Sequence, residues 1–139
     1  MRIAFPSGTR NIPTDRNPLR IVLGGGAAQG GASTVTYVDY TVPNLRRAEI
    51  RFCRGYYSVT AVLAAGQTVT VHLDYLSPVV NNVLVVQSIP AAPLNDRQQW
   101  EATQLFLSAG DHIQIISTMT AGAGTTVTAG GISGVEYDA

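Results

Sequence analysis

The residue types that most often carry chemistry are sparse in this chain of 139 residues. His72 and Asp74 stand two positions apart, a spacing that places both side chains on one face of a strand, where they could share a metal ion with His112. A metal site needs at least one more well-placed ligand than the sequence supplies, so we expect no metal and no other cofactor. A solvent-facing polar strand explains the pair equally well, and a pH-responsive interface is the alternative, because histidine titrates near neutral pH.

Nucleophilic catalysis is no better supported. None of the serines stands in a Gly-x-Ser-x-Gly elbow, and Cys53 has no histidine at an informative spacing. A lone cysteine is among the residue types most often buried as a small hydrophobe, so we expect Cys53 in the core. Asp74, Glu101 and Asp111 could in principle serve glycoside hydrolysis, but a β domain offers such a trio by chance. We therefore predict that the protein is not an enzyme.

The glycine-rich segment 24–31 follows an apolar run, which is the place of a phosphate-binding turn. The next segment, 34–42, alternates as a strand does and provides no helix N-terminus for a phosphate, and the chain has no lysine for a Walker-type loop. We therefore predict a strand over 19–23 followed by a flexible surface loop over 24–33.

Short apolar runs between turn residues predict an all-β chain. Alternation is clearest at 68–75, where Val69, Val71, Leu73 and Tyr75 are expected inward. Further strands are expected over 34–42, 47–54, 56–65 and 83–89, with Gly55 separating two of them, and the last forty residues read as strand, tight turn, strand, glycine-rich return and final strand. At most one helical turn is expected, near 44–47. Seven to nine strands at intervals of about ten residues predict an antiparallel sandwich or barrel.

Residues 1–18 differ from the rest. Three prolines and several turn residues, with no sustained period, predict an extended N-terminal arm. Ile3 and Phe5 are the apolar residues expected to anchor this arm on another surface. The N-terminus lacks the apolar region of a secretory signal, and no run approaches the ~18 apolar residues of a membrane span, so we expect a soluble protein without a membrane partner.

Charge is distributed unevenly although the formal net charge is zero. Residues 1–54 carry eight arginines against three acids, a net charge of +5, and the remainder carries one arginine against six acids, a net charge of −5. The two halves could interleave within one folded copy, or a basic segment of one copy could meet an acidic surface of a neighbour. Because no net basic domain results, we expect no nucleic-acid partner. The arginines expected to contact a partner are Arg10, Arg16, Arg46 and Arg47.

Tyr56 and Tyr57 are adjacent in a predicted strand. Neighbouring strand residues face opposite ways, so one of the two must point outward. An exposed tyrosine indicates a contact surface for protein or carbohydrate. Both tyrosines are therefore included among the predicted partner-binding residues.

The C-terminal third resembles the closing strands of the jelly-roll trimers of the C1q and tumour-necrosis-factor kind. In those proteins an apolar strand enters a Leu-x-x-Gly-Asp turn, and an alternating strand and a small-residue segment lead to the last strand. The corresponding residues here are Leu107 to Asp111, then Ile113 and Ile115, then Ala129 to Val135. Upstream, the aromatic motifs have no match. The resemblance implies an antiparallel jelly-roll β-sandwich over residues 19–139.

The size and build of the whole chain are similar to those of the small cement or decoration proteins of tailed-phage capsids. That resemblance implies a structural protein on the capsid exterior that is soluble before assembly and bridges neighbouring subunits. Its partners would be the major capsid protein and itself, as a homodimer or homotrimer. The alternative is a receptor- or carbohydrate-binding head of a phage fibre or a C1q-like module, which would use exposed aromatic residues such as Tyr56 or Tyr57.

Overall fold

The computed structural model describes residues 16–76, 81–90, 94, 96–102 and 104–139. These residues form nine β-strands, and no helix among them is long and apolar enough to cross a membrane. The strands are β1 (Leu19–Gly30), β2 (Ser33–Thr41), β3 (Arg46–Ala61), β4 (Thr68–Leu76), β5 (Asn81–Pro90), β6 (Arg97–Ala102), β7 (Leu105–Leu107), β8 (His112–Met119) and β9 (Thr125–Asp138).

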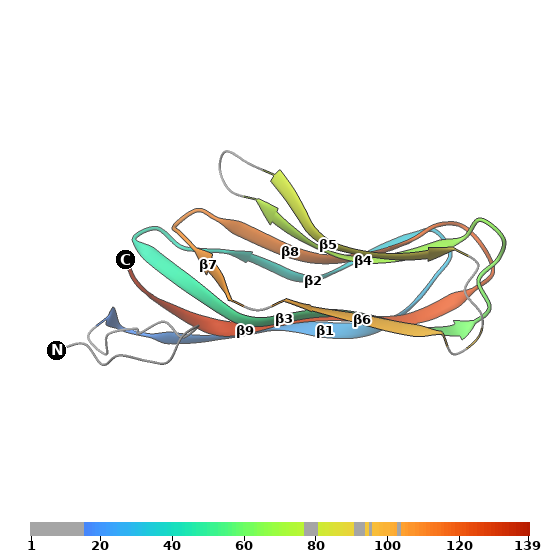
Figure 1. The fold of residues 1–139 in the computed structure, drawn as a ribbon, viewed down its shortest axis with the longest axis horizontal. Coiled ribbons are helices and arrows are strands. Elements are labelled where there is room, and N and C mark those ends of the chain that lie inside the picture. The colour runs from blue at the N-terminus through green and yellow to red at the C-terminus, as the bar shows by residue number, and fades with distance from the viewer. Residues whose placement is uncertain (1–15, 77–80, 91–93, 95, 103) are drawn as a thin grey trace.

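The strands form two antiparallel sheets that pack face to face (Figure 1). Sheet A has the order β1-β9-β3-β6, with β7 also beside β3, and sheet B has the order β2-β8-β4-β5. The pairs β1·β9, β2·β8, β3·β6 and β4·β5 are nested, as in one long hairpin whose tip is β4–β5. The pairs β3·β9 and β4·β8 arise because that hairpin is rolled up. This is a jelly-roll sandwich, which confirms the predicted fold class.

The core lies between the sheets, where alternate residues of each strand are buried. The predicted inward residues Val69, Val71 and Leu73 are fully buried, and the opposite sheet contributes Ile50 and Cys53. Trp100 of β6 closes one side of this core, and its indole N–H donates to the carbonyl of Val71 at 2.9 Å. Further buried core residues include Ile21, Val38, Val42, Ala48, Tyr57, Val59, Leu63, Leu107, Ile113, Ile115, Met119 and Ile132.

The prediction of a flexible loop over 24–33 was wrong for most of that segment. β1 continues to Gly30, and it pairs with β9 over twelve consecutive residues without a register shift. Gly24, Gly25 and Gly26 lie opposite Gly131, Gly130 and Ala129, so small residues of one strand face small residues of the other. At Gly24, where φ is 151°, a Cβ atom would lie 2.5 Å from the carbonyl oxygen of Gly130. Glycine is needed there because the two backbones approach so closely.

The predicted break at Gly55 was also wrong, because β3 is continuous from Arg46 to Ala61. A Cβ atom at Gly55 would overlap the indole ring of Trp100. Gly55 therefore provides a seat for a core side chain within a strand and does not end the strand. In place of a helical turn near 44–47, a turn closed by the Arg46 N–H and the Pro43 carbonyl at 3.2 Å leads into β3, with Leu45 at φ 63°.

Two polar side chains fix the loops at the ends of the sandwich. The carboxylate of Asp111 accepts hydrogen bonds from the Ser108 N–H and the Tyr75 hydroxyl, both at 2.9 Å, and so holds the predicted turn between β7 and β8. At the other end, fully buried Gln67 accepts from the N–H groups of Ala64 and Gly124 and donates to the Gly124 carbonyl. Gln67 thereby ties the β3–β4 loop to the β8–β9 loop.

Candidate interaction surface

The outward faces of the two sheets differ in chemistry. On sheet B the outward residues of β2, β4 and β8 are mostly polar, among them Thr36, His72, Asp74 and Gln114. On sheet A they combine apolar side chains with arginines. Val22 of β1 is 59% exposed and Val127 of β9 is 39% exposed. We name this outward surface of sheet A the arginine face, and define it by Arg20, Val22, Arg47, Arg51, Phe52, Arg54, Val127, Ala129 and Val135.

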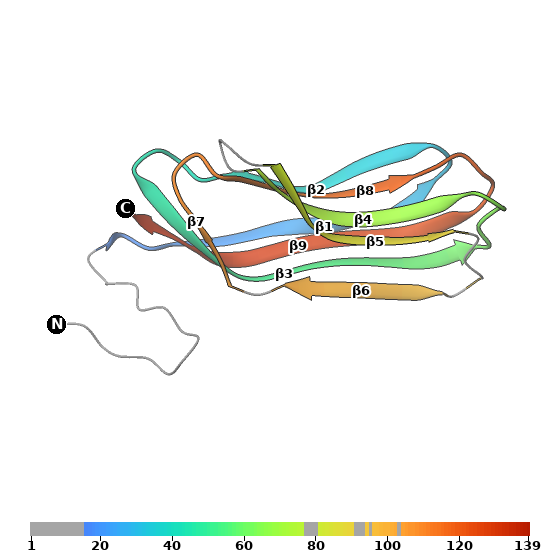
Figure 2. The same cartoon turned by 45° about the horizontal axis from the view of Figure 1, so that its top comes forward.

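A groove of about 500 Å³ runs along the arginine face, where β1, β9 and β3 lie side by side (Figure 2). Its floor includes Gly24, Gly26 and Gly131, and Val22 and Phe52 are among its apolar lining residues. Arg54 adds a guanidinium to the lining. Because glycines have no side chain, the floor is low and the neighbouring side chains stand above it. A second hollow of about 440 Å³, which shares Ser133 with the first and includes Arg20 and Arg51, extends the groove toward the start of β1.

Glu49 is the acidic residue among the outward positions of β3. Its side chain is 4% exposed, and its Oε1 lies 3.4 Å from Nε of Arg51, which is 53% exposed. Its other carboxylate oxygen is buried without a hydrogen-bond partner among the described residues. Glu49 therefore neutralises Arg51 only in part. Arg47 and Arg54 are exposed, and Arg54 lies opposite exposed Glu101 of β6.

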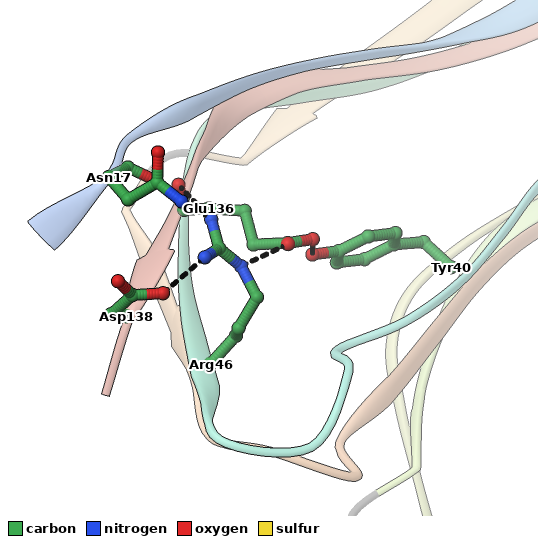
Figure 3. Close-up of polar contacts among 5 residues, drawn as sticks. All are labelled: Asn17, Tyr40, Arg46, Glu136 and Asp138. Carbon is green, nitrogen blue, oxygen red and sulfur yellow. Dashed lines mark hydrogen bonds and ion pairs between the residues drawn. The ribbon is translucent and has the colours of Figure 1, made fainter.

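Arg46 points inward and is held within the chain (Figure 3). Its guanidinium forms ion pairs with Glu136 and Asp138 and donates to the Asn17 carbonyl at 3.0 Å. Glu136 also accepts a hydrogen bond from the Tyr40 hydroxyl at 2.7 Å. Burial, followed by the hydrogen bond to this carboxylate, raises the pKa of Tyr40 well above its ordinary value. Arg46 therefore joins β3, β9 and β2, and it also holds the residue that precedes β1.

The other predicted partner-binding residues differ in their exposure to solvent. Arg47 is exposed beside Arg46, on the arginine face. Tyr56 is half-exposed and lies at a shallow hollow of about 210 Å³ with Arg97, Gln98 and Gln99.

Tyr57 is fully buried, and its hydroxyl donates to Asp96 at 3.2 Å. Because the Tyr57 side chain belongs to the core, only Tyr56 of the pair is accessible at the surface. The predicted anchors Ile3 and Phe5, together with Arg10, lie outside the described residues, and Arg16 is half-buried at the start of the described chain.

The two histidines occupy separate sites. Nε2 of His72 lies 3.4 Å from a carboxylate oxygen of Asp74, and His112 pairs instead with Asp39 of β2. The described residues contain no group of three His, Cys, Asp or Glu side chains that could hold a metal ion. His72 and Asp74 are therefore not brought together with His112.

Cys53 lies in the core, where its thiol donates to the Ala102 carbonyl at 3.3 Å. Burial raises the pKa of this thiol to about 11, so the nucleophilic thiolate is disfavoured near neutral pH.

Sequence reasoning did not identify Val22, Phe52 or Arg54 as surface residues. Val22 stands in an apolar run that is typical of a buried strand. A register shift between Ile50 and Phe52 turns Phe52 to the outer face, while Ile50 remains in the core. The alternation of Arg47, Glu49 and Arg51 was the signal that one face of β3 is charged.

No family model and no curated sequence matches this chain. Several solved structures are similar to it in chain path. A chain of infectious bursal disease virus, Gx strain, is 10% identical with a TM-score of 0.45, over 97% of this chain and 36% of its own length. PirA is 10% identical with a TM-score of 0.45, over 84% of this chain and 93% of its own. Eiger TNF from S. frugiperda is 12% identical with a TM-score of 0.39, over 81% and 91%. This chain thus spans about a third of the virus chain.

Proposed function

We propose that this chain is a structural binding protein that decorates the exterior of a viral capsid and, as a dimer or trimer, bridges neighbouring copies of the major capsid protein. The observation that carries the proposal is the contrast between the apolar, arginine-bearing outer face of sheet A and the polar outward residues of β2, β4 and β8 in sheet B. Val22 and Val127 are exposed large hydrophobic residues on the outer surface of this sheet, where Val22 is 59% and Val127 39% accessible to solvent. Apolar residues with arginine around them are typical of protein interfaces. The capsid as partner follows from the resemblance in size and build.

The arginine face determines the chemistry of the partner. Arg51 and Arg54 can each bind a carboxylate through two parallel hydrogen bonds, so an acidic surface fits them. Val22 and Phe52 require an apolar surface between those carboxylates. A ridge of partner side chains can enter the groove between them, because glycine residues form part of its floor. The partner surface is therefore acidic at its edges and apolar at its centre.

The arm supplies a second contact. Ile3 and Phe5 can enter apolar hollows on an adjacent capsid subunit while Arg10 and Arg16 meet acidic groups there. Once the arginine face is bound, the arm acts at a high effective concentration, so two weak contacts give firm attachment. A sandwich with one N-terminal arm thereby bridges two subunits.

The test is binding of the purified chain to capsids of its source virus that were assembled without it. Sedimentation measures the number of bound chains for the full chain, a chain lacking residues 1–17, Arg54→Ser, and the control Thr36→Glu. Arg54→Ser and Thr36→Glu both change the net charge by one unit at exposed strand positions, on opposite faces of the sandwich. We expect the deletion and Arg54→Ser to weaken binding at least tenfold and Thr36→Glu to leave it unchanged. Absence of binding, or equal binding by all four proteins, would refute the proposal.

A second candidate function is carbohydrate binding at Tyr56. The hollow that contains Tyr56 is also lined by Arg97, Gln98 and Gln99. An aromatic ring beside amide and guanidinium groups can stack on a sugar and hydrogen-bond its hydroxyls. This arrangement would make the chain a receptor-binding head, as in the alternative raised by the sequence.

Glycan-array binding distinguishes this candidate from the first. Carbohydrate binding at Tyr56 predicts that the full chain binds a glycan and that Tyr56→Ala does not. Tyr57→Phe, which removes only a buried hydroxyl, should bind as the full chain does. An array without a bound glycan would eliminate it.

A further inference from the structure

The free edge of sheet A has an unusual composition. β1 is the edge strand, and no described residue pairs with its side opposite β9. In an edge strand every second residue directs its N–H and C=O groups away from the sheet, and these groups can pair with another strand. Twelve residues of β1 are in regular register with β9, so this edge is long and has no bulge. It is a template for strand addition.

Other sheet edges carry the features that prevent such pairing. β2, the neighbouring edge strand of sheet B, has a register shift between Thr36 and Val38 and an exposed carboxylate at Asp39. β6 has only six residues and exposes Arg97 and Glu101. In contrast, β1 has no proline, no bulge against β9 and no charged side chain after Arg20. Natural edge strands without any of these features are normally covered.

The middle of β1 is uncovered on both of its faces. Val22 points outward and is 59% exposed, and Leu23 points inward, as Ile21 does, yet is 40% exposed. Residues 22–26 are exposed consecutively, which breaks the alternation expected of a sandwich strand. The two sheets therefore leave this edge open, and a strand added beside β1 would contact both Val22 and Leu23.

The sequence of β1 is complementary to itself. Its first half, Leu19 to Leu23, is bulky, and its second half, Gly24 to Gly30, is small except for Gln29, which is buried and hydrogen-bonded to Ser117 of its own chain. In an antiparallel pair of identical strands related by a two-fold axis normal to the sheet, residues opposite each other lie on the same face of the sheet. With the axis at one residue, odd-numbered residues therefore lie opposite odd-numbered residues, and even-numbered opposite even-numbered. An axis at Gly25 places Leu23 opposite Ala27 and Val22 opposite Ala28 of the second copy. At these two positions a bulky side chain fills the space that a small residue leaves, whereas Ile21 lies opposite the buried Gln29.

The same register separates the charges. Arg20 lies opposite Gly30, so the two copies of Arg20 are ten residues apart along the ladder, roughly 33 Å at the usual rise per residue. That separation exceeds the screening length of about 8–10 Å in physiological salt. Gly25, the residue on the proposed axis, is not crowded by its own chain. The nearest atom to a Cβ placed there is 3.9 Å away, on the ring of Tyr37.

We propose that β1 is a homodimer interface, in which β1 of a second copy pairs antiparallel about an axis at Gly25 and joins the two A sheets into one. The occupant is a second copy because the bulky half of β1 matches its own small half. The dimer concerns the edge of sheet A, not the arginine face, and it holds whether or not the chain attaches to a capsid.

The test is the native mass of the full chain by light scattering across a concentration series, for the wild type and three variants. Val22→Lys and Ala28→Lys each place a charge on the β1 edge, and Val127→Lys places the same charge on β9, one strand away on the same face. We expect a dimer whose dissociation constant rises at least tenfold in either edge variant and is unchanged in Val127→Lys. Thermal melting confirms that each variant is folded.

A rescue experiment tests the register. In the proposed register, residue 22 of each copy lies opposite residue 28 of the other copy. A chain with Val22→Lys and Ala28→Glu therefore forms two pairs of opposite charges in the dimer, whereas a chain with Val22→Lys and Ala28→Lys forms two pairs of like charges. We expect the first double variant to dimerise at least tenfold more tightly than the second. A wild-type monomer, a trimer, a dimer insensitive to both edge variants, or equal affinities of the two double variants would overturn the proposal.

Discussion

Replacing Arg46 by alanine tests whether this arginine serves the fold or a partner. The side chain of Arg46 is 13% exposed, and that of its partner Glu136 is 11% exposed. Removal of one member of a buried ion pair costs roughly 3–5 kcal/mol, because the other charge remains buried without compensation. Tyr40 still donates to Glu136, which favours the lower end of that range. Asp138 is 51% exposed, so water replaces its lost pair at little cost, about 0–1 kcal/mol.

We therefore expect Arg46→Ala to lower the free energy of unfolding by about 3 kcal/mol, measured by chemical denaturation. For a domain of this size the melting temperature would fall by about 10 °C. Arg47→Ala is the matched control, because Arg47 is adjacent but exposed on the opposite face of β3, and we expect a change within about 0.5 kcal/mol.

A double variant checks that the cost comes from the stranded carboxylate. Glu136→Gln keeps an acceptor for the Tyr40 hydroxyl but carries no charge. Arg46→Met with Glu136→Gln should therefore be more stable than Arg46→Met alone by at least about 1 kcal/mol. Equal stability of Arg46→Ala and Arg47→Ala would contradict a structural role for Arg46. So would a double variant whose loss in free energy of unfolding equals the sum of the losses in the two single variants.

Three further perturbations have directions that follow from the structure. Gln67→Leu removes the bonds that tie two loops together and should lower stability by about 2–4 kcal/mol in calorimetry; a loss below 1 kcal/mol would contradict this role. Leu45 is 84% exposed at φ 63°, so Leu45→Gly should raise the melting temperature slightly, and a decrease would count against strain there. Burial, with Asp96 nearby, raises the pKa of Tyr57 above its ordinary value, and burial raises that of Cys53 to about 11. In the unfolded chain both groups lose their protons at a lower pH than in the folded chain. Their contribution to the free energy of unfolding is therefore fully present below about pH 8.5. Above that pH the free energy of unfolding falls by up to about 1.4 kcal/mol per pH unit for each group. Melting curves from pH 8 to 11 should show a shallower decline for Tyr57→Phe, and a flat profile in the wild type would refute the assignment.

The residues that sequence reasoning placed correctly are those whose environment is local. Alternation over 68–75 identified the inward valines of β4, and the segment Ser108 to Asp111 forms the predicted turn, because side-chain period and turn chemistry are read within a few positions. The all-β class follows from the same signals.

The errors concern residues whose partners are distant in sequence. Gly24 to Gly26 form a strand only because β9 presents small residues opposite them. Arg46 resembled a surface arginine, but Glu136, ninety positions away, holds it inside the chain. Basic and acidic residues from the two halves of the chain thus meet within one folded copy, where Arg46 pairs with Glu136 and Asp138. One of the two interpretations of the charge distribution predicted such an arrangement. Local propensity contains no information about either pairing.

The nested pairing of β1 with β9 has a consequence for biosynthesis. β9 begins 95 positions after β1 ends, and it lies between β1 and β3 in sheet A. At typical translation rates of ~5–20 residues per second, β1 remains without its partner for about 5–20 s. During that interval both edges of β1, with Val22 and Leu23, are accessible to other nascent chains. The order of synthesis therefore leaves this strand exposed to aggregation longest, and slower translation after β1 should reduce the soluble yield.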